Sequence, residues 1–583
     1  MIRTDSENLW SEIEHAEKVR DSHLSIVKEL IDTLQGSAYR KAGTGKGQSS
    51  AARIENHPFE YLSLVVPRLI YDNPRFSART KRMGDAQMIA EAIGHGLNRW
   101  ILDVNLRQVL SRLAYDMLLN FAAALVCQQP MRLYDPSPAS TAHRPSVTRL
   151  PPAWFGFDPL ALDYSLARFA FHKYPMDLDD LKEYGAEGGW DQDSIGKLEA
   201  DGEQGSPDKF LADGVPDRNT IMVYEVWVPD EYGADHPGPE AGFHGTIHTL
   251  TKFSQGGTEV RKPRPFYGPP WGPYAFGGVY TVPDSPYPLS PLVATKDQQD
   301  EVSRVAMAAN KSAEKYKRLL LVDKKNNKLV KAIKDAEHDV VIPVEGFAAG
   351  EAEQFEVGGL TAQMLEQLSI SRERLKNASG IDDALRGNVT GQGTATEVSI
   401  AETAATMRLS FVKQQFADMV RGIGRSVSWY LFHDDRVVFP LGEDVAQSTG
   451  AEEPWFFGGL DGEDASFEDI ELDLDVYSME RTNEPLMQRN VTMALEQAMA
   501  VAAAAPQMPW LRVKELLAPI ADVFNMPQIL TAIDEEMLAA MTQAPMAQPS
   551  QPQGGRLSQD VTGPKRPMMG QYLGAEQGAG RRA

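Results

Sequence analysis

The longest regular pattern of apolar and polar positions in the chain covers residues 394–432. Apolar side chains recur there at helical spacing over about ten turns, from Val398 to Leu431. Thr394 and Glu397 open the segment with the pattern of a capping box. A helix of this length would extend about 58 Å. Few globular domains need so long a helix, so we expect it to span a larger structure.

Two shorter helices are predicted before the long one, at residues 291–317 and 360–377. Between them, residues 319–322 and 339–344 have the composition of strands and lie on either side of a basic segment. A polar loop rich in glycine and threonine, residues 380–393, connects the second helix to the long one. The pattern therefore predicts two helices, separated by a β segment, that lead into the long helix.

The rest of the chain alternates helical and strand patterns. Helices are predicted at residues 6–34, 85–105 and 106–127, the last one mostly apolar and therefore buried. Strands are predicted as a hairpin at 220–228 and 245–253, and as a half-buried strand at 470–476. Three more helices are predicted at 483–505, 510–524 and 528–541. Residues 177–216 are acidic and glycine-rich and are predicted to be mobile, and the composition after residue 545 predicts disorder.

Composition places the chain among folded globular proteins, with 42% hydrophobic and 24% charged residues over 583 positions. Cys127 is the only cysteine, which excludes a disulfide within the chain and zinc sites that need two cysteines. The first residues are polar, so no secretory signal is visible. The longest apolar run is too short to cross a bilayer. We expect a soluble cytosolic product without membrane contact.

The net charge of −23 narrows the possible partners. An acidic protein repels the phosphates of nucleic acid unless it concentrates cations on one surface. This charge argues against a protein that binds DNA tightly over its whole surface, but a well-solvated acidic surface would explain it equally well.

Motifs for catalysis are weak throughout the sequence. Residues 43–47, Gly-Thr-Gly-Lys-Gly, lack the first glycine and the hydroxyl residue of a nucleotide-binding P-loop. The adjacent acids Asp382 and Asp383 fit a turn or a helix cap better than a catalytic pair. Cys127 lies in an apolar stretch and is predicted to be a core residue. We therefore expect no catalytic residues and no cofactor.

Three histidines form the best candidate for a metal site. His236, His244 and His248 lie close in sequence to a predicted strand, and Asp235 could complete their ligand set. Histidines on a hairpin or a surface are far more common than metal ligands, so we expect that no metal is bound. A metal-dependent hydrolase that uses these histidines stays open as the enzymatic alternative.

The order of the segments resembles that of tailed-bacteriophage portal proteins, the head-to-tail connectors of the virion. The likeness lies in the helix at 291–317, the β segment, the returning helix, the polar loop and the long helix. The stretches 378–387, 107–116 and 223–228 are also similar to parts of that family. Asp382 stands where many members have proline.

The resemblance implies an α+β fold, mainly α. The wing would have a helical part (1–129) and an α/β part (130–284). Two antiparallel stem helices (285–318 and 360–379) would enclose a β-containing clip (319–359), and a tunnel loop (380–393) would lead to a long wing or channel helix (394–433). An acidic β region (434–482) would return to the wing, followed by a helical crown (483–545) and a disordered tail (546–583).

The resemblance also implies a function in phage assembly. Portal proteins form a ring, usually of twelve copies, at one capsid vertex of the virion, after assembly in the cytoplasm of the bacterial host. Double-stranded DNA passes through the ring without sequence preference during packaging and ejection. The implied partners are other copies of the chain, the major capsid protein, the terminase large subunit and a tail or neck adaptor protein. The portal itself does not hydrolyse ATP.

Three sets of residues are candidates for these contacts. The tunnel loop would touch DNA weakly through Arg386, Asn388, Thr390, Gln392, Thr394 and Thr396. The clip would meet an adaptor, the terminase or DNA through Lys324, Lys325, Lys328, Lys331 and Lys334. A plain connector and a solvated hairpin tip are the alternatives for these two segments. Gly422 and Gly424 could let the long helix kink, or could allow close packing.

Two structural alternatives remain beside the portal. The chain could be another ring-forming protein of the phage neck, which a β clip between two antiparallel helices would distinguish from a portal. It could also be an injected or secreted protein whose long helices form a coiled coil.

Overall fold

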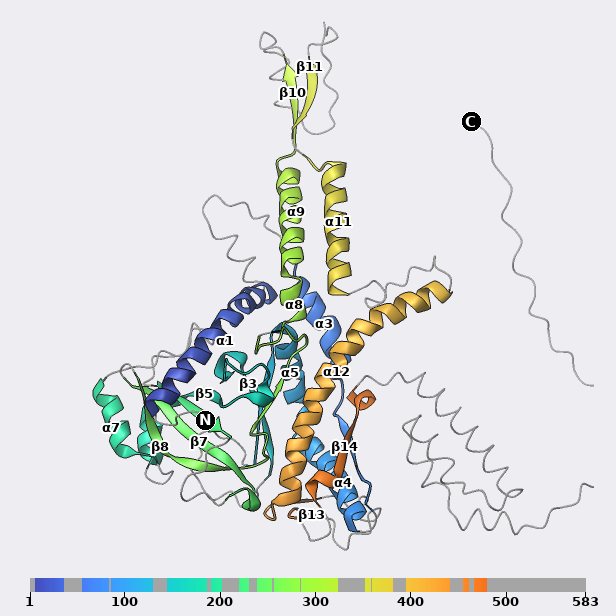
Figure 1. Cartoon of the computed structure of the whole chain (residues 1–583). Coiled ribbons are helices and arrows are strands. Elements are labelled where there is room, and N and C mark those ends of the chain that lie inside the picture. The colour runs from blue at the N-terminus through green and yellow to red at the C-terminus, as the bar shows by residue number, and fades with distance from the viewer. Residues whose placement is uncertain are drawn as a thin grey trace, which may run out of the picture. The chain divides into compact units, whose positions relative to one another are not determined.

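The computed structural model describes residues 6–35, 55–82, 85–128, 144–185, 190–201, 220–229, 238–253, 256–283, 285–322, 352–357, 359–380, 395–440, 455–460 and 466–479 (Figure 1). The chain divides into two compact units, residues 1–481 and 482–583, and the described residues all belong to the first. The predicted crown helices, the tail and the glycine-rich segment 43–47 lie outside them.

The described part is a mixed α+β structure, about half helical, with several small antiparallel sheets. Its α-helices are α1 (Ser6–Leu34), α3 (His57–Leu69), α4 (Asp85–Asp103), α5 (Leu106–Leu119), α6 (Leu178–Gly185), α7 (Gln192–Asp201), α8 (Pro291–Ala294), α9 (Lys296–Glu314), α11 (Ala362–Ser379) and α12 (Ala395–His433). No helix in the described ranges combines the length and the apolar character needed to span a membrane.

The strands form five sheets in the described residues. The largest has the order β4-β5-β6-β7-β8, with bounds Phe155–Phe157, Ala170–Asp177, Thr220–Val228, Phe243–Phe253 and Gly256–Tyr267. A second has the order β3-β2-β9, with bounds Ser146–Leu150, Ala122–Cys127 and Tyr274–Gly277. The pairs are β1-β14 (Arg75–Thr80 with Ile470–Asp475), β10-β11 (Lys317–Val322 with Ala352–Val357) and β12-β13 (Val438–Pro440 with Trp455–Phe457).

Several predicted elements are confirmed with little change. The helix at 6–34 is α1, and the hairpin at 220–228 and 245–253 is the antiparallel pair β6 and β7. The alternating strand at 470–476 is β14, which pairs with β1 and so joins the acidic region to the N-terminal part of the chain. Both strands bury one face, which is the arrangement that alternation predicts.

The long helix α12 is built into the main hydrophobic core. Its predicted apolar positions from Leu409 onward are all buried: Leu409, Val412, Phe416, Met419, Val420, Ile423, Val427 and Leu431. They pack with buried side chains of α3, α4, α5 and β2. Burial of this stripe, rather than helix propensity, fixes the position of the second half of α12.

The predicted helix at 106–127 is wrong in its second half. Helix α5 ends at Leu119, Asn120 leaves helical geometry with φ −155° and ψ −97°, and Ala122–Cys127 is the central strand β2 of its sheet. Both faces of this strand are buried, so its sequence is a continuous apolar run that periodicity cannot distinguish from a buried helix. Cys127 therefore lies at a strand end, with its Sγ 3.3 Å from the Ser146 hydroxyl.

The acidic segment after residue 177 also differs from its prediction. It contains α6 and α7, whose buried Leu181, Ile195 and Leu198 pack with the large sheet. The prediction of mobility rested on composition, whereas four buried apolar residues, Leu178 and the three just named, attach these helices to the sheet.

Candidate functional site: the helix pair, the strand hairpin and the long helix

The helix pair begins at a serine that is tied to the core. The buried Ser290 hydroxyl accepts hydrogen bonds from the amides of Leu292 (3.1 Å) and Val293 (3.4 Å), so it caps α8. The same hydroxyl donates a 2.6 Å bond to the carbonyl of Leu118 at the end of α5. The start of the helix pair is therefore held against the wall of the main core.

The predicted single helix at 291–317 is two helices with a break at Thr295. This residue has φ −104° and ψ 6°, and its hydroxyl donates to the carbonyl of Pro291 at 3.1 Å. The side-chain amide of Gln299 donates to the Thr295 hydroxyl (3.0 Å) and to the carbonyl of Leu292 (3.2 Å). Side-chain bonds of this kind compete with the helical ladder, which explains the one-residue interruption.

Helices α9 and α11 lie side by side and run antiparallel (Figure 1). Near the start of α9, Glu301 accepts a 3.0 Å hydrogen bond from Ser371 and lies 3.6 Å from Arg374. At the other end, the amide of Gly359 donates to the carbonyl of Ser312 at 3.0 Å. The buried apolar contact between the helices consists of Val302, Ala306, Leu368 and Leu375.

A two-stranded hairpin continues from the far ends of these helices. Strands β10 and β11 pair antiparallel, from Lys317 opposite Val357 to Val322 opposite Ala352. The first predicted strand, 319–322, is confirmed, whereas 339–344 lies outside the described residues and the partner strand is β11. The lysines at 324, 325, 328, 331 and 334 also lie outside them, so their role stays a prediction.

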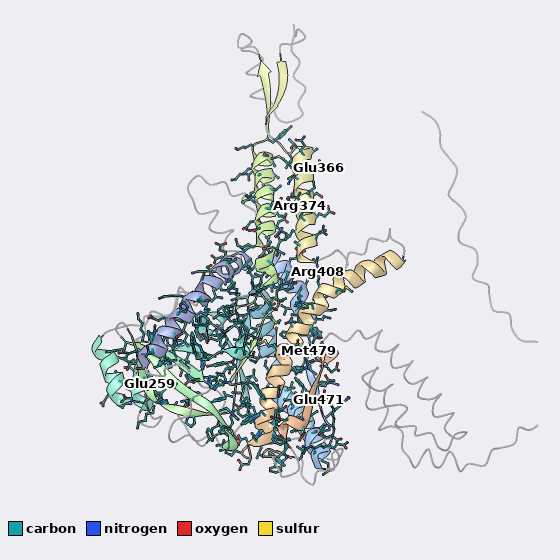
Figure 2. All side chains as sticks on the ribbon, in the orientation of Figure 1. Glu259, Glu366, Arg374, Arg408, Glu471 and Met479 are labelled. Atoms are coloured by element: carbon teal, nitrogen blue, oxygen red, sulfur yellow. The ribbon has the colours of Figure 1, made fainter. Side chains whose placement is uncertain are left out.

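The end of α11 is held by a side chain from α12. Gly380 ends α11 with φ 71°, a left-handed conformation that favours glycine, and its amide donates to the carbonyl of Lys376. The Arg408 guanidinium donates to the carbonyl of Asn377 at 2.7 Å, next to the end of α11 (Figure 2). Arg408 thus satisfies a carbonyl at the negative end of the helix dipole and ties α11 to α12.

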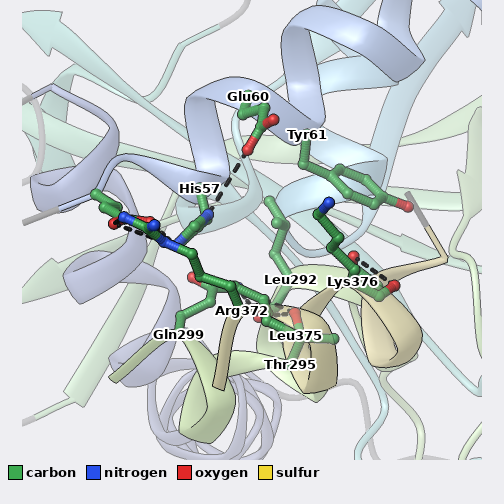
Figure 3. Close-up of a pocket in the computed structure, with 11 residues that line it drawn as sticks. His57, Glu60, Tyr61, Leu292, Thr295, Gln299, Arg372, Leu375 and Lys376 are labelled. Atoms are coloured by element: carbon green, nitrogen blue, oxygen red, sulfur yellow. Dashed lines mark hydrogen bonds and ion pairs between the residues drawn. The ribbon is translucent and has the colours of Figure 1, made fainter. Parts of the chain in front are cut away.

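A pocket of about 360 Å³ lies at the base of the helix pair (Figure 3). Residues from α3, α8, α9 and α11 line it, together with Glu55 just before α3. Arg372 crosses from α11 to form an ion pair with Glu55, and His57 Nε2 lies 3.3 Å from the same carboxylate. These contacts connect α11 to a segment more than 300 positions earlier in the chain.

The environment of Glu55 makes the contribution of its carboxylate to folding stability depend on pH. The adjacent His57 imidazole, together with the Arg372 guanidinium, lowers the pKa of the Glu55 carboxyl from 4.5 to about 2. A depressed carboxyl pKa stabilises the folded state above the unfolded value of 4.5. This stabilisation is lost as the pH falls from about 4.5 towards 2.

We therefore expect Glu55→Gln to flatten the acid side of the stability profile. Wild-type protein should lose stability between pH 5 and pH 3 more steeply than the variant, measured as the free energy of unfolding in urea. Glu7→Gln, at an exposed position of α1, is the matched control and should follow the wild type. Equal slopes for wild type and Glu55→Gln would contradict the role given to this ion pair.

The proposed loop and kink residues are only partly described. Arg386, Asn388, Thr390, Gln392 and Thr394 lie outside the described residues, and Thr396 is described only as part of the backbone of α12. A Cβ on Gly424 would lie 2.6 Å from the ring of Phe76, whereas one on Gly422 would meet no atom within 4 Å. Close packing, the alternative named for these glycines, therefore applies at Gly424, and a kink at either position stays a prediction.

The histidines do not converge on a metal site in the described ranges. His248 is buried, and its Nδ1 lies 2.7 Å from a carboxylate oxygen of Glu259. The His244 ring packs against Trp429, and His236 lies outside the described residues. Among those residues, no three histidine, cysteine or acidic side chains are grouped so that they could hold a metal ion.

Comparison with known proteins adds no identification. The chain matches no protein-family model and no curated protein sequence. The helix pair, the hairpin and α12 are therefore the features from which a function can be inferred. Sequence reasoning did not find Glu55, His57 or Arg408, because nothing in their local sequence indicates contacts with a distant helix.

Proposed function

We propose that this chain is a portal-type protein that forms a ring in a tailed bacteriophage. The observation that carries the proposal is the antiparallel pair α9 and α11, extended by the β10-β11 hairpin and followed by α12. This is the order of stem, clip, stem and long helix expected from the resemblance. The hairpin between the two helices favours a portal over other ring-forming proteins of the phage neck.

The small core of the helix pair supports assembly. Four buried apolar side chains join helices of 19 and 18 residues, and most of the α11 surface is exposed. Helices of this length are marginal in water unless they pack along an extensive apolar face. Neighbouring copies around a ring would cover the two flanks of the pair and supply the packing that one chain lacks.

The charge supports a channel rather than a DNA clamp. Each copy has a net charge of −23, so an assembled ring would repel DNA phosphates wherever no continuous row of cations faces the lumen. DNA could then slide without tight binding. The polar loop predicted at 380–393 is proposed to touch DNA weakly. The major capsid protein, the terminase large subunit and a tail or neck adaptor are the proposed partners at a capsid vertex.

Deleting residues 388–393 should leave ring assembly intact and reduce the number of DNA-filled particles. The helices proposed to hold the copies together are unchanged, whereas the polar groups proposed to face DNA are removed. Electron microscopy of particles made by a phage that carries the deletion would measure this. Replacing the same six residues with glycine and serine separates loop length from side-chain chemistry, and a normal count of filled particles for both variants would contradict the role of the loop.

A further inference from the structure

The face of α11 that points away from α9 has an acidic stripe. Glu366, Ile370, Glu373 and Asn377 are spaced by four, three and four positions, which places them on one side of a helix. All four are exposed, and they lie opposite the buried Leu368 and Leu375. Figure 2 shows Glu366 towards the hairpin end of this helix.

The face of α9 that points away from α11 has a basic stripe with the same spacing. It consists of Arg304, Ala308, Lys311 and Lys315, all of them exposed. This side lies opposite Val302 and Ala306, which pack on α11. The helix pair therefore presents opposite charges on its two flanks.

The charged members of both stripes have no ion-pair partner within the part of the chain that the structure describes. Other charges on the same two helices do have one. Lys296 pairs with Asp300, Arg372 with Glu55, and Arg374 with Glu301. Asp297 and Glu314 of α9 have no ion pair among the described residues either, so the flanks are distinguished by the gathering of one sign of charge on each, not by the lack of partners alone.

The two stripes lie at matching heights along the helix pair. Because Glu301 is level with Ser371 and Arg374, and Ser312 is level with Gly359, Arg304 lies between the levels of Glu373 and Glu366. Lys311 lies beyond Glu366 on the other side. The offsets are about two to five residues, about 3 to 7.5 Å along the axis, which arginine and lysine side chains can reach.

We propose that the basic stripe of one copy docks on the acidic stripe of a second copy of this chain. Glu366 would lie between Arg304 and Lys311 of the neighbour, and Glu373 would pair with its Arg304. Two different surfaces meet in this contact, so it is heterologous and generates a ring when the rotation closes. The closed ring and the matching heights rest on the proposed function, whereas the attraction between the stripes is argued from the charges.

Paired charge reversals test the contact. Variant A is Glu366→Lys with Glu373→Lys, and variant B is Arg304→Glu with Lys311→Glu. Each variant alone would juxtapose like charges at every contact, so the concentration needed for half-assembly should rise at least tenfold. In an equimolar mixture every contact between A and B is attractive, so assembly should return. Analytical ultracentrifugation of the full chain measures both effects, and circular dichroism checks that each variant is folded.

Glu7→Lys with Glu468→Lys is the matched control for variant A, because it makes the same change of charge at exposed positions outside the stripes. It should assemble like the wild type. If A and B also assemble like the wild type, or if folded A and B fail to assemble when mixed, the contact is overturned while the proposed ring stands. If the wild type forms no oligomer, both proposals fail. If variant B loses only nucleic-acid binding, the basic stripe serves nucleic acid and the contact is overturned.

Discussion

Replacing Phe416 with alanine is expected to lower the free energy of unfolding by about 3–5 kcal/mol. Phe416 is fully buried in α12, within the cluster that also includes side chains of α3, α4, α5 and β2. Removing the ring would leave a cavity in the part of the molecule that positions the long helix. Because close-packed interiors relax only partly around such a cavity, both the lost burial and the cavity contribute.

Chemical denaturation of the full chain would measure this effect, with Phe411→Ala as the matched control. Phe411 lies on the same helix but is 44% exposed, and its ring stacks on Tyr280 with centroids 5.7 Å apart. The control should cost about 1 kcal/mol, the range expected for one aromatic pair. Similar losses for the two variants would show that the second half of α12 is not anchored in the core as described.

Replacing Leu368 with aspartate is expected to separate α11 from α9 and abolish assembly. Leu368 is 9% exposed and supplies one of the four buried apolar side chains between the helices. A carboxylate at this position would be buried without a partner, which costs several kcal/mol unless the helices move apart. Hydrogen exchange of the α9 and α11 amides would report the separation, and sedimentation would report the loss of oligomers.

Leu365→Asp tests whether the loss of assembly in Leu368→Asp comes from the buried position or from the added charge itself. Leu365 lies on the same helix, one turn away, and is 51% exposed. This variant should keep slow hydrogen exchange in both helices and should assemble. If Leu368→Asp assembled as well as Leu365→Asp, the pairing of α9 with α11 would not be needed for the oligomer.

Long periodic segments could be predicted from the sequence, and α12 is the clearest case. Its stripe from Leu409 to Leu431 repeats often enough that helical spacing alone identifies it, and burial of every predicted position confirms it. Strand β14 could be predicted because its apolar and polar residues alternate and it buries one face. The β6-β7 hairpin could be predicted because its β-branched and aromatic residues favour strands, although both faces of β6 are buried.

Segments without a regular alternation of apolar and polar positions could not be predicted. The apolar run of β2 is buried on both faces, and so it was taken for the continuation of α5. Strand β11 carries Glu353, Gln354 and Glu356 on a short segment, and only its pairing with β10 makes it a strand. The break at Thr295 depends on side-chain hydrogen bonds that exist only once Gln299 and Pro291 are in place.

The contacts at the base of the helix pair lay beyond sequence reasoning for a related reason. The ion pair between Glu55 and Arg372 joins residues 317 positions apart, and Arg408 donates to a carbonyl 31 positions earlier, that of Asn377. Neither contact has a local pattern, since charged residues are common on exposed helices. Periodicity predicts that a helix exists, whereas its attachment to distant segments is decided by tertiary packing.

Electron microscopy and a mass measurement of the purified full chain test most directly the claim that the protein forms a ring. Negative-stain electron microscopy with native mass spectrometry should show rings around an open channel, with a mass near 770 kDa for about twelve copies of 64.3 kDa. A single species of 64.3 kDa at every protein concentration, with no ring in the images, would contradict the account.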